Sequence, residues 1–303
     1  MPQSTMTDPY WSRTADRWES VDRADPVVWP AEQAADFPAV LTADEVEHFD
    51  RDGYHHATGL LTEFEAGELL AEANRLAAAA ADRPAPGVVI EPGSRAVRSL
   101  FRLHRTNDAF RRLAKDPRLV DVARQLLGSE VYVHQSRINF KPAFDGKQFF
   151  WHSDFETWHV EDGLPRMRAV SVSLSLTDNN EFNGPLMVVP GSHRKYVRCV
   201  GATPENHFEQ SLKNQEYGVP ARDAMQQLVE AGGITAPKGP PGSALFFECN
   251  LMHGSGVNLS PFPRTNVFLV YNSVENAVTE PFGEMPPRPE FLAERDIVPV
   301  SEL

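Results

Sequence analysis

The chain carries a histidine and a carboxylate two residues apart. His152 and Asp154 lie within Phe150–Asp162, which reads FWHSDFETWHVED. In a strand, residues at i and i+2 project from the same face with Cα atoms about 6 to 7 Å apart, so the two side chains could reach one cation. A second histidine would complete the 2-His-1-carboxylate set that is typical of non-haem Fe(II) oxygenases. The pair alone is a weak indication of a metal-binding site, so the interpretation depends on finding the third ligand.

Four downstream histidines are candidates for that ligand: His159, His193, His207 and His253. On a continued strand His159 would point away from His152, although a turn between them could cancel this argument. His193 lies in a tight turn and His207 in a polar segment. His253 ends an apolar run and precedes a Gly-Ser-Gly turn. We therefore predict that His253 is the third ligand.

Arg264 follows His253 by eleven residues and begins another apolar run. If the three ligands hold a metal, an octahedron retains three positions, enough for a bidentate 2-oxo acid and dioxygen. The planar, two-pronged guanidinium of Arg264 suits the far carboxylate of such an acid. The alternative for Arg264 considered alone is a surface ion pair.

The totals describe an ordinary folded protein of 303 residues, with 41% hydrophobic and 23% charged residues. Lys and Arg number 29 against 42 Asp and Glu, a net charge of −13, which disfavours nucleic acid or an anionic membrane as partner. The two cysteines lack metal-binding spacing, and no apolar stretch has the length of a signal or membrane segment. We expect a cytoplasmic protein with reduced thiols.

The first part of the chain has helical patterns. Residues 1–40 lack a sustained period and are expected to form an irregular arm, whereas 41–128 are expected to be mostly helical. Capping boxes at Thr42 and Thr62 each predict the start of an amphipathic helix. Apolar spacing over 108–127 predicts two further helices.

From residue 130 to 275 the pattern changes to short β-prone runs. Residues 169–176 alternate almost strictly, with serines that either line a cavity or face solvent. The tail beyond Glu280 is rich in proline and offers little chemistry. We predict a mainly β fold, a cupin-like jelly roll with an N-terminal helical layer, in which 41–303 form one catalytic domain. The expected strands are 131–133, 138–140, 149–151, 169–176, 186–189, 244–247, 251–253 and 266–271.

Two longer blocks carry a family resemblance. Phe149–Pro165, with Met167–Ala169 after it, resembles the signature of the ectoine hydroxylases in the phytanoyl-CoA dioxygenase superfamily, and Asn183–His193 is similar to a block shared more widely there. The resemblance spans roughly residues 41 to 273. It implies a cytoplasmic, homodimeric enzyme that uses Fe(II), 2-oxoglutarate and O2 to convert ectoine to 5-hydroxyectoine, with succinate and CO2 as coproducts.

The resemblance also implies roles for individual residues. His152, Asp154 and His253 match iron ligands, and Arg264 matches the residue that grips the C5 carboxylate of 2-oxoglutarate. Around that cosubstrate the family pattern places Gln135, Asn139, Phe149, Ser171 and Ser255. Around ectoine it places Trp158, Phe247 and Phe268, with Arg137 as a candidate for its carboxylate. Aromatic rings suit the delocalised cation of ectoine, although their sequence context alone predicts barrel core.

Two alternatives remain open on the sequence. One is another hydroxylase of the same superfamily that acts on a different small molecule. The other is a non-redox, cupin-like metal-binding protein, in which Arg264 would be incidental. Turnover of 2-oxoglutarate with Fe(II) separates the second alternative from the hydroxylases.

Overall fold

The computed structural model describes residues 8–13, 16–30, 37–82, 85–91, 96–204, 208, 217–283 and 285–303. His207 lies outside these residues. Within them, no helix has the length and apolar character needed to cross a bilayer.

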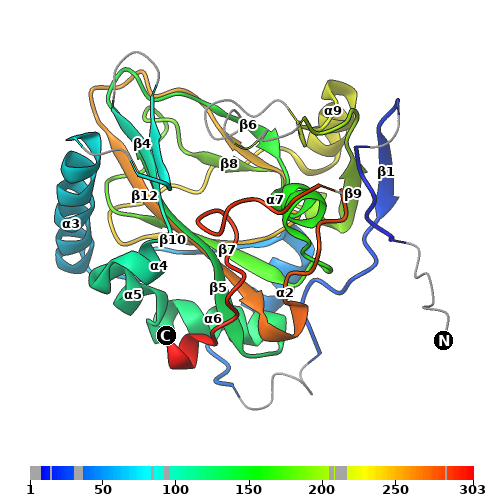
Figure 1. The fold of residues 1–303 in the computed structure, drawn as a ribbon, viewed down its shortest axis with the longest axis horizontal. Coiled ribbons are helices and arrows are strands. Elements are labelled where there is room, and N and C mark those ends of the chain that lie inside the picture. Colours follow the sequence, from blue (N-terminus) through cyan, green and yellow to red (C-terminus); the bar gives the residue numbers. More distant parts are fainter. Residues whose placement is uncertain are drawn as a thin grey trace.

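Two antiparallel sheets form the body of the protein (Figure 1). Many neighbouring strands are distant in sequence, which is the connectivity of a jelly roll rather than of a meander. The predicted fold class is therefore confirmed. The larger sheet has the order β2 (Tyr54–Ala57), β10 (Ala244–Glu248), β7 (Ala169–Ser175), β12 (Arg264–Ser273), β5 (Val131–Lys141), β4 (Val97–Phe101) and β3 (Val88–Ile90). The smaller sheet has the order β6 (Phe149–His152), β11 (His253–Ser255) and β8 (Leu186–Val188).

The predicted helices form a layer along the larger sheet (Figure 1). Both capping boxes are present: the Thr42 N–H donates to Glu45 at 2.8 Å and the Thr62 N–H donates to Glu65 at 2.7 Å. These bonds satisfy donors that a helix start would otherwise leave unpaired. The helices of this layer are α2 (Ala43–Asp52), α3 (Glu63–Asp82), α4 (Leu103–Thr106), α5 (Asp108–Ala114) and α6 (Pro117–Leu127).

Alternation along the strands gives the larger sheet two different faces. The outer face carries aliphatic side chains such as Val172 and Leu269, which share one buried cluster with Phe110 of α5 and Leu119 of α6. The inner face is polar, because residues that pair across β5, β12 and β7 point to the same side. The serines of β7 are buried, so they line the interior rather than face solvent. The polar inner set is Gln135, Arg137, Asn139, Lys141, Ser171, Ser173, Ser175, Arg264 and Asn266.

Some local expectations were wrong. Residues 131–141 form one continuous strand, β5, rather than two short ones. His152 ends β6 whereas Asp154 begins the helical turn α7 (Asp154–Thr157), so the pair does not share a strand. His253 begins β11 instead of ending a strand. At His152 and His253 an element ends or begins within one or two residues of the expected position, and a hydrophobicity pattern does not resolve such a boundary.

The N-terminal arm is more regular than expected. Residues Glu19–Asp22 form β1, which pairs antiparallel with β9 (Lys195–Arg198), as Figure 1 shows at the edge of the molecule. The arm is thereby fixed to β9, which lies between β8 and β11 in the sequence. The remaining elements are η1 (Trp158–Asp162), η2 (Ser192–Arg194), α9 (Arg222–Gly232), η3 (Val274–Asn276) and η4 (Val300–Glu302).

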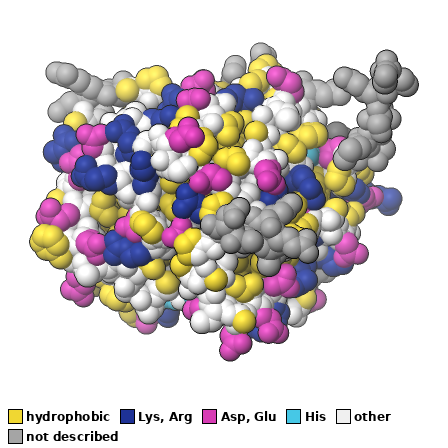
Figure 2. All heavy atoms as spheres, turned by 90° about the horizontal axis from the view of Figure 1, so that it is seen from below, with side chains coloured by type: hydrophobic (Ala, Val, Ile, Leu, Met, Phe, Trp, Pro, Cys, Tyr) yellow, Lys and Arg dark blue, Asp and Glu magenta, His cyan; other side chains and the backbone are white. Residues whose placement is uncertain are grey.

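The outer surface carries charges of both signs. Figure 2 shows acidic and basic side chains interspersed over the face seen from below, with apolar side chains between them. No continuous basic area dominates this face, which agrees with the net charge of −13.

Candidate active site

Three potential metal ligands converge where the smaller sheet meets α7. His152 and His253 are direct partners across β6 and β11, and their ring centroids are 4.2 Å apart. The carboxylate of Asp154 lies 3.5 Å from Nε2 of His152 and 3.8 Å from Nε2 of His253. One ligand atom from each residue can be chosen so that all three lie within 4.8 Å of one another. The structure thus brings together the three residues that the sequence selected.

Both imidazoles present the correct nitrogen to a shared metal. Nδ1 of His152 lies 2.7 Å from the carbonyl oxygen of Phe150, and Nδ1 of His253 lies 2.9 Å from that of Leu251. A carbonyl only accepts, so each Nδ1 carries the proton and each Nε2 keeps its lone pair. Such a hydrogen bond from the second nitrogen is the usual support of a metal-binding histidine. The donor set therefore fits a divalent iron ion.

The charges of the site favour the same protonation states. Burial, together with the neighbouring His152, lowers the pKa of His253 to about 4, against the opposing effect of Asp154. Burial alone would raise the pKa of Asp154, but the two imidazoles and the Arg137 guanidinium outweigh it and hold that pKa below its usual range. Near pH 7 His253 is neutral and Asp154 is ionised, as metal ligands must be.

A narrow cavity opens beside His152 and Asp154. It is bounded by both sheets, and four of the predicted pocket residues line it: Gln135, Arg137, Phe149 and Trp158. The sequence analysis missed the other lining residues, which are Ser99, Phe101, Thr157, Glu161, Tyr217, Arg288 and Leu292. Thr157 and Glu161 belong to the matched motif and could have been found there. Arg288 and Leu292 come from the tail, where no sequence signal indicated them.

The other predicted residues lie around this cavity. Ser171 Oγ donates to Asp154 at 3.3 Å, and Asn139 accepts a hydrogen bond from Ser99 at 2.8 Å. The ring of Phe247 is 4.9 Å from that of His253. Ser255 follows His253 on β11 by two residues, at the same end of the site. All of them therefore belong to one region of the fold.

Two arginines on the inner face, the buried Arg264 and the partly buried Arg137, have donors without a partner among the described residues. Arg264 is 3% exposed, and its Nε and Nη1 have no hydrogen-bond partner among the described residues. Burial lowers its pKa to about 10, so it stays charged near neutrality. Arg137 lies with its guanidinium carbon 4.8 Å from the centre of the Phe268 ring, and its Nε is likewise without a partner. Buried cations in this state favour binding of a carboxylate.

His159 and His193 do not join the metal ligands. His159 lies within η1, where its Nδ1 is 2.8 Å from the Leu164 carbonyl oxygen and its Nε2 is 3.1 Å from the Asp8 carboxylate. His193 is buried, and its Nε2 is 3.0 Å from the carbonyl oxygen of Asp50. The exclusion of His159 was right, but the assumed strand was not, because this segment is helical.

The N-terminal arm holds the helical turns that follow Asp154. Arg13, which is 4% exposed, forms ion pairs of 2.6 Å with Glu156 of α7 and Glu161 of η1. Tyr10 packs edge-on against Phe155, with 5.1 Å between ring centroids. The arm therefore fixes the segment that carries both Asp154 and Trp158.

Arg13→Met is expected to lower the free energy of unfolding by about 3 to 5 kcal/mol, because it leaves Glu156 buried without its cation and leaves Glu161 only the longer pair with Arg288 at 3.8 Å. Chemical denaturation at pH 7 measures the change, with the exposed Arg17→Met as the matched control. Equal stability of the two variants would contradict this role of Arg13.

The C-terminal tail also contributes to the wall of the cavity, through Arg288 and Leu292. Arg288 makes a bidentate pair with Asp162 at 2.8 and 2.5 Å, and Gln135 Nε2 donates to the carbonyl of Leu292 at 2.6 Å. Glu294 is 1% exposed and lies within 3.4 Å of His104 Nε2. The expectation that the tail offers little chemistry was wrong, because two of its side chains line the cavity.

Stability at low pH is expected to depend on Glu294. Burial alone would raise its pKa, but the contact with His104, the hydrogen bond from Arg102 and the charge of Arg105 lower it to about 2. A carboxyl whose pKa is lowered by folding stabilises the protein above its unfolded pKa of about 4.3 and loses that contribution as the pH falls towards 2.

The difference in unfolding free energy between wild type and Glu294→Gln should therefore be largest near pH 6 and shrink steadily below pH 4. Denaturation at several pH values measures it. Glu290→Gln is the control, because Glu290 also pairs with Arg102 but is exposed. A difference that does not change with pH would contradict the assignment.

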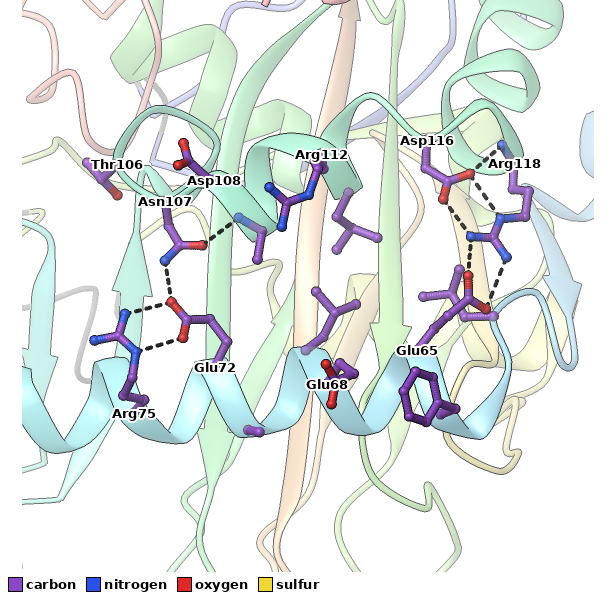
Figure 3. A pocket seen from close by; sticks show the side chains of 16 residues that line it. Glu65, Glu68, Glu72, Arg75, Thr106, Asn107, Asp108, Arg112, Asp116 and Arg118 are labelled. Atoms are coloured by element: carbon purple, nitrogen blue, oxygen red, sulfur yellow. Dashed lines mark hydrogen bonds and ion pairs between the residues drawn. The ribbon is translucent and has the colours of Figure 1, made fainter.

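A wider groove lies elsewhere on the protein. A groove of about 1000 Å³ separates α3 from the segment between Thr106 and Arg118 (Figure 3). Several of its charged residues are paired within the groove, for example Glu72 with Arg75 at 2.6 Å and Glu65 with Arg118 at 2.8 Å. It contains none of the three potential ligands, so we place the active site at the narrower cavity.

Comparison with known proteins points in the same direction. The family model described as phytanoyl-CoA dioxygenase (PhyH) matches residues 49–266. The chain is 53% identical to the ectoine dioxygenase of Bordetella bronchiseptica, over 96% of this chain and 94% of that protein. It is 46% identical to the ectoine dioxygenase of Streptomyces coelicolor, over 98% of both.

Solved structures agree. The chain superposes on EctD from S. alaskensis in complex with 2-oxoglutarate and 5-hydroxyectoine with a TM-score of 0.85, at 45% identity and 98% coverage of both chains. The same protein with bound Fe gives a TM-score of 0.83, at 45% identity and 97% coverage of both chains. A more distant likeness, to the carbocyclase SnoK at 18% identity and a TM-score of 0.60, supports the fold alone; it covers 87% of this chain and 94% of that one.

Proposed function

The chain belongs to the phytanoyl-CoA dioxygenase family and, within it, to the ectoine dioxygenases, and on this premise we propose that it hydroxylates ectoine to 5-hydroxyectoine. The reaction consumes 2-oxoglutarate and O2 and yields succinate and CO2. The observation that carries the proposal is the His152, Asp154 and His253 set beside a cavity lined by Arg137, in a chain about half identical to known ectoine dioxygenases.

The iron would be held by Nε2 of both histidines and by the Asp154 carboxylate. When bound, Fe(II) with 2-oxoglutarate and O2 supplies the oxidant that replaces a ring hydrogen of ectoine by hydroxyl. The protein keeps both imidazoles in the ligating tautomer through the carbonyls of Phe150 and Leu251. It also orients Asp154 through Ser171. These contacts hold the three ligand side chains in place for the metal.

Binding of 2-oxoglutarate is assigned to the polar inner face of the larger sheet. Arg264 offers two unpaired donors to the C5 carboxylate, and its burial strengthens the attraction. Phe149 and Gln135 line the same cavity as the metal ligands His152 and Asp154. Asn139, Ser171 and Ser255 supply polar side chains around it. A narrow polar channel of this kind aligns the acid along the sheet and excludes bulk water.

Ectoine is a zwitterion with a delocalised cation and a carboxylate, so it needs an aromatic face and a cationic partner. Trp158, 3% exposed, lines the cavity beside Thr157 and provides the first. Arg137 provides a cation within the same cavity. The guanidinium of Arg137 already covers the Phe268 ring, so we assign Phe268 to the support of Arg137.

The direct test is product analysis after aerobic incubation of the protein with ectoine, Fe(II) and 2-oxoglutarate. We expect NMR to show a hydroxyl at C5 of ectoine and one succinate for each product molecule, with no product when 2-oxoglutarate is omitted. Succinate release that another small molecule stimulates and ectoine does not would indicate a different hydroxylase. Failure to consume 2-oxoglutarate at all would indicate a non-redox metal-binding protein.

We further propose, from the family resemblance, that the protein acts in the cytoplasm as a homodimer. Light scattering after size-exclusion chromatography measures its mass against the 33.8 kDa of one chain, and the mass of a monomer would contradict the dimer.

We also assign 41–303 to one catalytic unit, because the tail residue Arg288 lines the same cavity as the sheet residue Arg137. Truncation of the chain before Arg288 should therefore abolish activity.

A further inference from the structure

Ser153 lies between two of the metal ligands, His152 and Asp154, and immediately precedes the helical turn α7. A serine at such a position usually accepts a hydrogen bond from the first N–H groups of the helix that follows. The Ser153 hydroxyl makes no such bond to α7 and instead donates to Oδ1 of Asn250 at 2.8 Å. Ser153 is 2% exposed, so the bond is shielded from water. Its hydroxyl therefore serves a contact across the fold rather than the start of the helix.

Asn250 lies in the turn between β10 and β11, three residues before His253, and is fully buried. Its Nδ2 donates to the carbonyl oxygens of His193 at 3.0 Å and of Lys195 at 2.9 Å. Because carbonyl oxygens only accept, the amide nitrogen must face them, which leaves Oδ1 as the acceptor for Ser153. Both donors of the side chain are used, so the amide group has a single favourable orientation.

A second hydrogen bond joins the same two segments of the chain. The N–H of Phe155, in α7, donates to the carbonyl oxygen of Cys249 at 2.8 Å. The turn is also held from its other side, because Glu248 accepts the N–H of Asn250 at 2.7 Å and pairs with Arg23 of the N-terminal arm at 2.8 Å. The side chains of this ion pair are both buried. Movement of the turn would therefore break a buried ion pair, which is costly.

These two segments carry all three metal ligands. His152 and Asp154 flank Ser153 in the chain, and His253 follows Asn250 by three residues. Pairing of β6 with β11 fixes His152 opposite His253, but Asp154 lies beyond the end of β6 and outside that pairing. The hydrogen bond from Ser153 to Asn250 therefore helps to fix the position of Asp154 relative to His253.

We propose that Ser153 and Asn250 are positioning residues that raise the affinity of the site for its divalent metal. They do so by holding the Asp154 carboxylate beside the two imidazoles, 3.5 and 3.8 Å from their Nε2 atoms. This inference rests on the metal site of the proposed function. Loss of a residue that supports metal ligands typically weakens metal binding by about 10- to 100-fold.

The test is a calorimetric titration with Mn(II), the neighbour of Fe(II) in the affinity order of divalent metals. Ser153→Ala removes only the hydroxyl and should weaken Mn(II) binding by about 10- to 100-fold. Ser153→Thr keeps the hydroxyl and should retain the wild-type affinity. Ser129→Ala is the matched control, because Ser129 is also buried and its hydroxyl donates to another side chain, Ser273, at 2.6 Å. This control should leave the Mn(II) affinity unchanged, although it loses a comparable hydrogen bond.

Three results would overturn the inference. The first is an unchanged Mn(II) affinity in folded Ser153→Ala. The second is an equal loss in Ser129→Ala, which would mean that metal affinity only follows the general stability of the protein. The third is a Ser153→Thr variant that binds as weakly as Ser153→Ala, since the hydroxyl would then not be the cause. The titration contains neither ectoine nor 2-oxoglutarate, so failure of hydroxylation and failure of this inference remain distinguishable.

A further variant covers the case in which Ser153→Ala does not fold. Ser153→Cys keeps the shape of the side chain, but a thiol is only a weak hydrogen-bond donor. Its Mn(II) affinity should therefore fall below that of the wild type, while Ser129→Cys should bind as the wild type does. A folded Ser153→Cys variant with the wild-type affinity would contradict the role of the hydrogen bond to Asn250.

Discussion

Replacing Asp154 by alanine is expected to abolish stable Fe(II) binding and to lower turnover by more than about 100-fold, because loss of residues that merely support metal ligands already costs 10- to 100-fold. Asp154 contributes the negative charge of the ligand set, lying 3.5 Å from His152 and 3.8 Å from His253. Without it, two neutral imidazoles and the nearby Arg137 cation face the iron. The remaining site can hold a divalent ion only weakly.

The measurement is the anaerobic charge-transfer absorption of the complex of protein, Fe(II) and 2-oxoglutarate, followed by aerobic turnover. Asp22→Ala is the matched control, since Asp22 is 86% exposed and pairs only with Lys195 at the surface. We expect the control to show normal absorption and turnover. A normal absorption band in Asp154→Ala, together with full turnover, would remove Asp154 from the ligand set.

Helix starts and ends could be predicted because their causes are local. Thr42 and Thr62 bond to glutamates three residues later, and Gly53 ends α2 with φ 82°, a conformation that favours glycine. Such signals lie within four residues and are independent of the rest of the fold. The helices that begin after Thr42 and Thr62 were therefore predicted correctly, whereas strands β2 and β4 of the same region were not expected.

The two faces of the larger sheet were only half predictable. Alternation over 169–176 indicates one polar and one apolar face, but not which one points inward. The answer depends on β12 and β5, which lie about a hundred and about forty residues away. The same register places Lys141 beside Arg264, and a single sequence does not reveal it. Contacts of this kind become visible only when the strands are aligned.

The ligand set was predicted for partly wrong reasons. His152 and Asp154 were expected on one strand, yet Asp154 begins α7. Its carboxylate still approaches His152 because only Ser153 separates the two residues.

The arm and the tail were misjudged for a different reason. Arg13 acts through Glu156 and Arg288 through Asp162, contacts that span more than 120 residues of sequence. The local sequence around Arg13 and Arg288 does not predict these long-range contacts.

The second large effect is expected from Arg264. Arg264→Ala should raise the 2-oxoglutarate KM by about 100-fold or more and leave the ectoine KM nearly unchanged, because a bidentate, buried hydrogen-bond pair to a carboxylate is lost. Arg264 is 3% exposed and has no partner within the described chain, so its charge is fully available to a ligand. Steady-state kinetics with each substrate varied in turn separates the two constants. Arg75→Ala removes an exposed arginine and serves as the control.

Combining this change with Lys141→Met decides whether Arg264 and Lys141, its partner across β12 and β5, act on one carboxylate. If they do, the second substitution should cost much less in 2-oxoglutarate affinity when the first is already present, since residues that share a partner are not additive. Independent, additive losses would mean that the two side chains act on different groups. An unchanged 2-oxoglutarate KM in Arg264→Ala would instead exclude Arg264 from the cosubstrate site. Because the pairing of β5 with β12 holds the two side chains together, we expect a strongly non-additive result.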